Sequence, residues 1–252
     1  MDPGVTAGGG LLRVAELWRY PVKSLLGERL AAAEAGPEGL DGDRRWALFD
    51  RATGFGLTGR RVPDLLFASA RLRPGGDVEV VLPDGTVTTD DAVLSAWLGR
   101  DVALRRADEH TGERVYENPD DVEDEESGRW DPFEGAGGAF HDNASARLSL
   151  LSTGTLGSWD RRRFRPNVLL DGAGEDRLDG QRVRLGGALL AVGRPLARCV
   201  MVTRPQSGGI GRDTGVLKTV HREHGGRLAA RAVVLEPGTV RVGDVVTPDA
   251  QR

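Results

Sequence analysis

The chain has 252 residues, of which 34 are basic, 38 are acidic and 39% are hydrophobic, and its formal net charge is −4. This length suits one large all-β domain or two modest ones, and the composition is typical of a globular protein. The negative charge argues against a general nucleic-acid binder, and no apolar run approaches the roughly 20 residues that span a bilayer. We expect a protein that binds neither nucleic acid nor membrane, with the cytoplasm as its location.

The first half of the chain has the turn residues and alternating apolar residues that are typical of β-structure. Residues 1–10 predict a flexible leader containing three consecutive glycines. A β-rich domain is predicted over 11–116, with a hairpin about the turn residues 83–85. Its other strands are predicted from alternating apolar residues within 14–24, 44–50, 65–76 and 100–106.

Only two helices of more than one turn are signalled. The first begins after Asp90 or Asp91 and ends at Gly99, which is a favoured helix terminator. The second covers the stretch "GVLKTVHREH" and ends at Gly225 and Gly226.

Residues 117–135 predict an acidic mobile linker between two halves. Seven acidic side chains lie within 117–130, and few apolar ones accompany them. A solvated loop is the favoured interpretation, and a lid or a docking patch for a basic partner is the alternative.

The second half, over 136–248, predicts a β-barrel domain. Short strands bounded by Gly or Pro recur through it, with one strand at 196–203 and a closing hairpin about residues 236–238. No βαβ alternation is visible. The expected fold class is therefore mainly β, with a barrel, an N-terminal β-rich subdomain and a few short helices.

Several loops carry groups suited to an anion. Lys23 and Ser24 follow a predicted strand, Arg44 enters another, and four arginines with Asn167 lie within 161–167. Arg offers a planar fork to phosphate oxygens, and Lys offers a compact point charge. Taken singly each cluster indicates a solvated basic surface, whereas convergence of the loops at one barrel end would create an anion site.

Cys199 is the only cysteine, which excludes an intramolecular disulfide, a CxxC zinc site and an all-cysteine iron–sulfur cluster. A single cysteine is most often a small core residue. Arg198 and Arg194 nearby favour instead a thiolate that ligates a transition metal or attacks as a nucleophile. All four histidines are interpreted as surface or packing residues, because His221 and His224 lack the HExxH spacing.

An ordered set of motifs resembles the MOSC domain family, named after the C-terminal domain of molybdenum cofactor sulfurase, with its usual N-terminal partner. The motifs are "LWRYPVKSLLG", "GDRRWALFD", "FRPNVLLDG", "LARCVMVT" and "EPGTVRVGDVV". The resemblance runs from about Leu12 to Val246 and includes the mitochondrial amidoxime-reducing components.

The resemblance implies a molybdopterin-type cofactor whose molybdenum is bound by Cys199, which is then the metal ligand and the catalytic residue. Soft thiolates suit such a metal. The residues that it implies for the phosphate and pterin are Lys23, Ser24, Arg44, Ser152, Thr155, Arg165, Asn167 and Arg198. In the loop after the cysteine, Pro205 and Ser207 replace two carboxylates of the family's D-x-D-T-G pattern.

The implied activity is reduction of small N-hydroxylated or related N–O compounds. The sequence contains neither a pyridoxal-phosphate desulfurase domain nor an appended ferredoxin domain, so we expect electrons from a separate electron-transfer protein. The alternative is a carrier that holds the cofactor, or a sulfur atom on Cys199, for delivery to other enzymes. A degenerate barrel without cofactor is the remaining interpretation.

Overall fold

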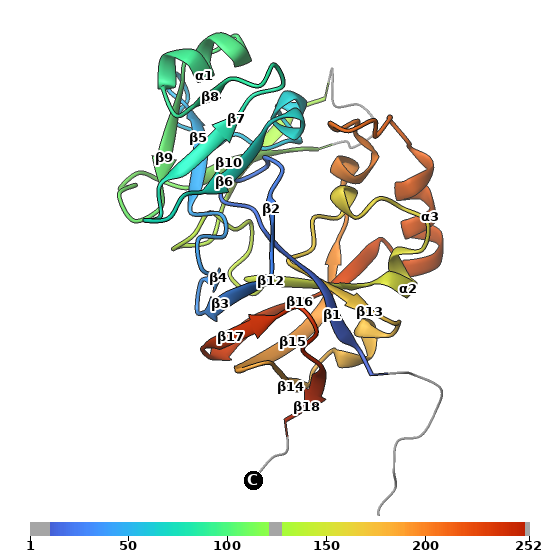
Figure 1. Cartoon of the computed structure of the whole chain (residues 1–252). Coiled ribbons are helices and arrows are strands. Elements are labelled where there is room, and N and C mark those ends of the chain that lie inside the picture. The colour runs from blue at the N-terminus through green and yellow to red at the C-terminus, as the bar shows by residue number, and fades with distance from the viewer. Residues whose placement is uncertain (1–10, 121–127, 250–252) are drawn as a thin grey trace, which may run out of the picture.

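The computed structural model describes residues 11–120 and 128–249. These residues form eighteen strands, three α-helices and four 3-10 turns. Figure 1 shows a lower lobe around one large curled sheet and an upper lobe of smaller sheets with α1. The expected fold class, mainly β with few helices, is confirmed.

The large sheet has eight strands and draws on both halves of the chain. β1 pairs with β13 of the second half, so the first predicted domain contributes strands to the second. Leu17, Leu150 and Leu190 are fully buried in the core of this sheet. Its spatial order is β18 (Val246–Pro248), β14 (Arg182–Leu185), β15 (Ala188–Ala197), β16 (Arg227–Glu236), β12 (Leu148–Ser152), β13 (Val168–Asp171), β1 (Arg13–Arg19) and β2 (Glu28–Leu30).

The end of the chain does not close as a hairpin, so that prediction is wrong. β17 (Gly238–Arg241) pairs with β3 (Ala32–Gly36), which also pairs with β4 (Gly39–Leu40). Gly238 packs directly on the backbone of Gly187, where a Cβ would lie 2.3 Å from the Gly187 carbonyl carbon. The chain therefore crosses the turn between β14 and β15 instead of returning along β16.

The upper lobe consists of short antiparallel pairs. β5 (Trp46–Asp50) pairs with β9 (Val102–Arg106), and β7 (Val78–Val81) lies between β6 (Ser69–Leu72) and β8 (Val87–Thr88). The predicted hairpin about 83–85 is confirmed. The strand expected from residue 65 begins only at Ser69, because Pro63 starts a 3-10 turn, a position that suits its fixed φ.

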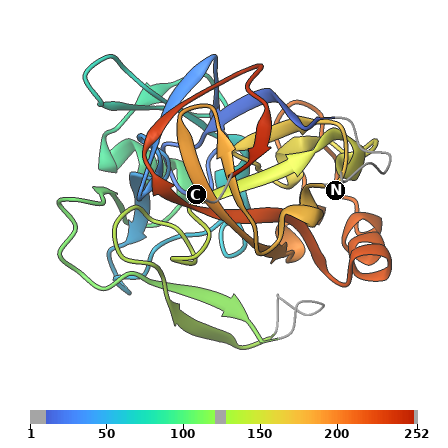
Figure 2. The same ribbon diagram turned by 90° about the horizontal axis from the view of Figure 1, so that it is seen from below.

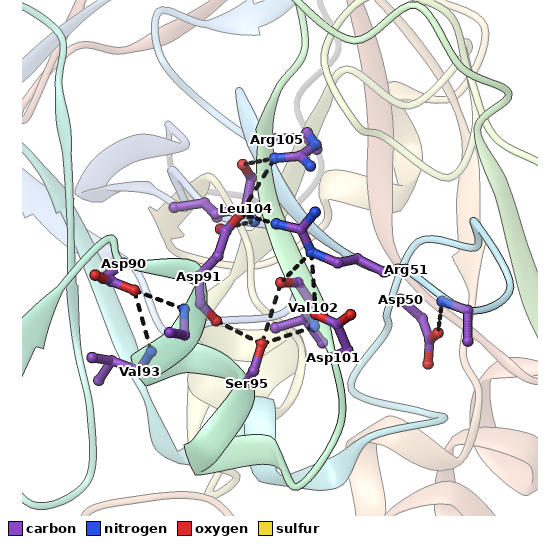
Figure 3. A network of polar contacts seen from close by, with 12 residues as sticks. Asp50, Arg51, Asp90, Asp91, Val93, Ser95, Asp101, Val102, Leu104 and Arg105 are labelled. Atoms are coloured by element: carbon purple, nitrogen blue, oxygen red, sulfur yellow. Dashed lines mark hydrogen bonds and ion pairs between the residues drawn. The ribbon is translucent and has the colours of Figure 1, made fainter.

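The helix α1 (Asp91–Leu98) is confirmed, and a polar network ties it to β9 (Figure 3). The Asp90 side chain accepts hydrogen bonds from the first turn, and Gly99 ends the helix at a left-handed φ of 63°. The Asp91 carboxylate accepts the Leu104 amide at 2.8 Å and pairs with Arg51 at 2.6 Å. The helix is thus fixed at its first turn to the neighbouring strand.

Three details of the second half bear on the site. β12 and β13 are parallel and are joined through α2 (Thr153–Leu156), which the sequence pattern did not reveal. The strand expected at 196–203 is also wrong, since β15 ends at Ala197 and Cys199 precedes a 3-10 turn. Pro195 has no N–H for the ladder, and the register of β15 shifts on both sides of it.

The helix α3 (Gly215–His224) ends at Gly225, as predicted. Among the described helices, none is long and apolar enough to cross a membrane.

Strands β10 (Val115–Pro119) and β11 (Trp130–Glu134) form a separate two-stranded ribbon, visible in green at the lower edge of Figure 2. The predicted linker over 117–135 is therefore wrong at both of its ends, where residues pair as strands. Its residues 121–127 lie outside the described part of the chain.

Candidate functional site

One cavity of about 460 Å³ gathers most of the predicted site residues. Segments from both halves of the chain form its wall, although these segments are far apart in the sequence. Larger hollows elsewhere contain none of the predicted residues. The predicted residues that line the cavity are Lys23, Ser24, Arg44, Arg165, Asn167, Arg198 and Cys199.

The backbone is strained at three of these residues. Four non-glycine residues of the described chain have positive φ, and three are Ser24 at 69°, Arg44 at 51° and Arg165 at 52°. Such conformations cost about 1–3 kcal/mol each and cluster at functional sites. The strain indicates that the fold holds these three side chains in orientations that relaxed backbone would not give.

The wall of the cavity is strongly cationic. Burial lowers the pKa values of Arg165 and Arg198 to about 10, which leaves both guanidinium groups charged at neutral pH. A cavity with this excess of one sign attracts a ligand of the opposite charge. Against one carboxylate, Asp142, the wall carries six cationic side chains: Lys23, Arg44, Arg60, Arg163, Arg165 and Arg198.

Arg165 keeps a donor without a partner. Its Nη2 donates to the Leu25 carbonyl at 2.5 Å, and its guanidinium lies 4.4 Å from the centroid of the Tyr20 ring. Its Nη1 is buried and has no hydrogen-bond partner in the structure.

Arg198 shows the same pattern. Its Nε donates to the Leu228 carbonyl at 2.8 Å and its Nη1 to the Phe164 carbonyl at 3.1 Å, while its buried Nη2 has no partner. Leaving a buried polar donor unsatisfied costs about 1–3 kcal/mol. An oxyanion in the cavity is the natural partner for both arginines.

Lys23 is largely engaged by the protein. Its ammonium donates to the Phe140 carbonyl at 3.0 Å and to the Asp142 carboxylate, and it lies 4.3 Å from the centroid of the Tyr116 ring. Burial lowers the pKa of Lys23, and the attraction of Asp142 offsets part of that effect. Lys23 therefore orients Asp142, and protein acceptors take two of its three N–H groups.

Ser24, Arg44 and Asn167 also have protein partners. The Ser24 hydroxyl accepts the Gly59 amide at 2.9 Å, and Arg44 pairs with the buried Asp43. The Asn167 amide donates to the carbonyl of residue 18 at 3.2 Å and accepts from the hydroxyl of residue 149 at 3.2 Å. Of these contacts, the one between Asn167 and residue 18 joins the two halves of the chain at the cavity wall.

Ser152 and Thr155 are not part of the cavity wall, contrary to what the resemblance implies. The hydroxyls of both residues donate to the buried carboxylate of Glu175, at 2.5 Å and 2.8 Å. Ser152 also caps α2 by accepting the Thr155 amide.

Sequence reasoning missed Arg60, Asp142 and His141 as wall residues. The Nη2 of Arg60 lies 3.4 Å from the Cys199 sulfur, although 139 residues separate them. His141 is buried, as a packing residue would be, and its Nε2 donates to the Glu38 carbonyl at 3.0 Å. Only the grouping of polar residues in "FHDN" could have drawn attention to 140–143.

The half-buried Cys199 contributes the one sulfur of this wall that can become a thiolate. Within residues 11–120 and 128–249, no three His, Cys, Asp or Glu side chains gather as a metal site. A metal at Cys199 therefore needs further ligands from a bound cofactor. The donor set fits such a group, because the soft sulfur of Cys199 and two arginines that each keep an unpartnered N–H group line the same cavity.

Solved structures resemble the chain only at low sequence identity. No curated protein matches the chain. The crystal structure of the YUAD protein from Bacillus subtilis is 10% identical over 95% of this chain and 96% of its own, with a TM-score of 0.43. That of YiiM from Geobacillus stearothermophilus is 15% identical over 54% of this chain and 73% of its own, with a TM-score of 0.34.

The family models are decisive. Residues 11–111 match the model of the MOSC N-terminal beta barrel domain, and residues 140–247 match that of the MOSC domain. Together the two matches cover most of the chain. The chain therefore belongs to the MOSC family, which is associated with molybdenum cofactor binding.

Proposed function

We propose that the cavity binds a molybdenum cofactor, with Cys199 as the thiolate ligand to the metal. One observation carries this proposal: Arg165 and Arg198, each with a buried N–H group that has no partner, line the same cavity as the only cysteine. The cavity volume of about 460 Å³ also lies within the range of about 300–1,000 Å³ usual for ligand sites.

Each residue has a distinct role in this proposal. Arg165 and Arg198 donate to the phosphate of the cofactor, since guanidinium forks match phosphate oxygens. Arg60 keeps positive charge beside the Cys199 sulfur. Ser24 and Arg44 shape the loops that form the wall.

We further propose that the protein is an oxidoreductase that reduces N-hydroxylated or related N–O compounds. Bound molybdenum cofactor would supply two-electron oxygen-atom chemistry. In the net reaction the N–O bond breaks, an N–H bond forms and the oxygen leaves as water, so two electrons and two protons are consumed. A separate electron-transfer protein supplies the electrons.

A carrier function is the second candidate. Cys199 is only half-buried, so its sulfur is accessible to another protein. In this case the chain delivers the cofactor, or a sulfur atom bound to Cys199, to other enzymes.

Metal and pterin analysis together with an assay of turnover separates these functions. We expect wild-type protein from a cofactor-producing host to contain molybdenum and pterin and to reduce benzamidoxime with reduced viologen. Cys199→Ser should lose bound molybdenum and turnover, whereas Met201→Leu, another change in the cavity wall, should retain both. A persulfide on Cys199 without metal would favour the carrier. Unchanged molybdenum in Cys199→Ser would show that the ligand assignment is wrong.

A further inference from the structure

Tyr20 is a buried side chain of the first half that contacts both halves of the cavity wall. It directly follows β1 and is only 2% exposed. Its hydroxyl donates to the carbonyl of Pro166 at 3.1 Å, although 146 residues separate the two. Pro166 stands between Arg165 and Asn167, which both line the cavity. Tyr20 does not line the cavity, so it acts on a ligand there only through its neighbours.

Two cavity arginines lie over the Tyr20 ring. The guanidinium carbon of Arg165 is 4.4 Å from the ring centroid, and that of Arg44 is 5.3 Å from it. Cation–π attraction acts within about 6 Å of the centroid and is strongest where water is excluded. Burial raises the pKa of Tyr20, so the phenol is neutral at neutral pH and attracts both groups through its ring face, not as a phenolate. One neutral ring thus holds two like charges that repel each other.

The backbone of Tyr20 also fixes Arg44. The Tyr20 carbonyl accepts the Arg44 amide at 2.7 Å. The Tyr20 amide donates at 2.7 Å to the Asp43 carboxylate, whose other oxygen pairs with the Arg44 guanidinium. Arg44 and Arg165 have positive φ angles of 51° and 52°, and such strain persists where the surrounding contacts over-determine the backbone. Tyr20 supplies contacts of this kind to both arginines.

The ring itself is closely packed. An added Cβ at Gly27 would lie 2.7 Å from the Tyr20 Cδ1, so ring and backbone are in direct contact there. A side chain in such a site keeps one orientation, because its rotation would require the neighbouring backbone to move. The ring therefore gives both guanidinium groups a fixed surface to lie on before any ligand enters the cavity.

We propose that Tyr20 is a positioning residue that preassembles Arg44 and Arg165 into an anion-binding pair. Its ring holds the two guanidinium groups in place at the cavity wall, so neither long side chain has to be ordered when an anion binds. Its hydroxyl joins the two halves of the chain and contributes to stability, not to anion affinity. This inference rests on the proposed function for the identity of the anion as the cofactor phosphate, but not for anion binding itself.

Calorimetry with inorganic phosphate on the full chain, purified from a host that makes no molybdenum cofactor, tests the inference. Tyr20→Leu removes the ring and the hydroxyl and should weaken phosphate binding at least about tenfold. Tyr20→Phe keeps the ring and should bind phosphate as wild type does, although its midpoint of urea unfolding falls because the Pro166 carbonyl loses its donor. Leu94→Ala, a buried change in α1 that does not line the cavity, is the control and should lower the urea midpoint without changing phosphate affinity.

Two further variants show whether the ring acts through the arginines. Pentafluorophenylalanine at position 20 matches phenylalanine closely in shape but has an electron-poor ring face, so it should bind phosphate more weakly than Tyr20→Phe does. This comparison holds even if Tyr20→Leu does not fold. In an Arg165→Gln background, Tyr20→Leu should weaken phosphate binding less than it does in wild type, because one of the two positioned groups is already absent.

The outcomes separate the two proposals. Phosphate binding that is weakened in Tyr20→Leu and retained in Tyr20→Phe supports the inference even where the protein holds no molybdenum, and in that case only the proposed function fails. Wild-type phosphate affinity in folded Tyr20→Leu, or equal affinities with phenylalanine and its pentafluoro analogue, overturns the inference even if molybdenum and pterin are bound. Failure of folded wild-type protein to bind phosphate also overturns it, as does a weakening in Leu94→Ala equal to that in Tyr20→Leu.

Discussion

Two polar clusters of the second half differ in whether their polar groups have hydrogen-bond partners. In the first, the hydroxyls of Ser152 and Thr155 both donate to the buried Glu175 carboxylate. In the second, Arg165 and Arg198 line the cavity, and each retains a buried N–H without a partner. The first cluster is internally complete, and the second lacks a partner of opposite charge.

The contrast separates structural from ligand-binding polar groups. A buried polar group is normally hydrogen-bonded, so each exception needs an explanation. The Ser152 cluster joins α2 to the 3-10 turn Glu175–Leu178, and its hydrogen bonds are complete in the folded chain without a ligand. In the proposed function, the cavity arginines complete their hydrogen bonds when an anion binds.

The largest expected effect comes from breaking the complete cluster. Glu175→Ala leaves two buried hydroxyls without their acceptor and opens a small cavity. The free energy of unfolding should fall by about 3 kcal/mol, as measured by urea denaturation. Asp176→Ala, at the exposed neighbouring position, is the control and should change stability little. Wild-type stability in Glu175→Ala would refute a structural role for this cluster.

A smaller effect concerns His141, which lies in the cavity wall. Burial lowers its pKa well below 6.5, and Arg44 and Arg147 lower it further. Below about pH 6.5 the unfolded chain takes up a proton that the folded chain does not, so acid lowers the free energy of unfolding by about 1.4 kcal/mol per pH unit. The stability that the neutral His141 imidazole contributes is fully present above about pH 6.5 and is lost as the pH falls below it.

Replacing His141 by a side chain that does not titrate removes this dependence of stability on pH. His141→Gln should therefore show a shallower loss of stability than wild type between about pH 6.5 and 5.5. His221→Gln, on the exposed face of α3, serves as the control and should keep the wild-type slope. Equal slopes in wild type and His141→Gln would contradict a buried neutral imidazole.

Local signals in the sequence predicted local structure well. The cap at Asp90 and the terminators Gly99 and Gly225 act within one helical turn, so both helices were correctly predicted. Motif order led to part of the cavity wall, since seven of the nine proposed residues line it. Their roles in binding stay predictions.

Contacts between distant segments could not be predicted. Lys23 and its partner Asp142 are 119 residues apart, and no short-range pattern links them. The same holds for the pairing of β17 with β3, which depends on how β17 passes over the turn at Gly187. Ser152 was assigned to the cofactor from the family resemblance, but only its contact with Glu175 shows that its hydroxyl already has a partner.

The central claim is that the unpartnered arginines bind the anionic part of the cofactor. The most direct test is the pterin content per folded chain of Arg165→Gln beside Glu175→Ala, with both purified from a cofactor-producing host. We expect Arg165→Gln to lose most of the bound pterin and Glu175→Ala, although less stable, to retain it. Wild-type pterin content in Arg165→Gln, or equal losses in both variants, would contradict the account.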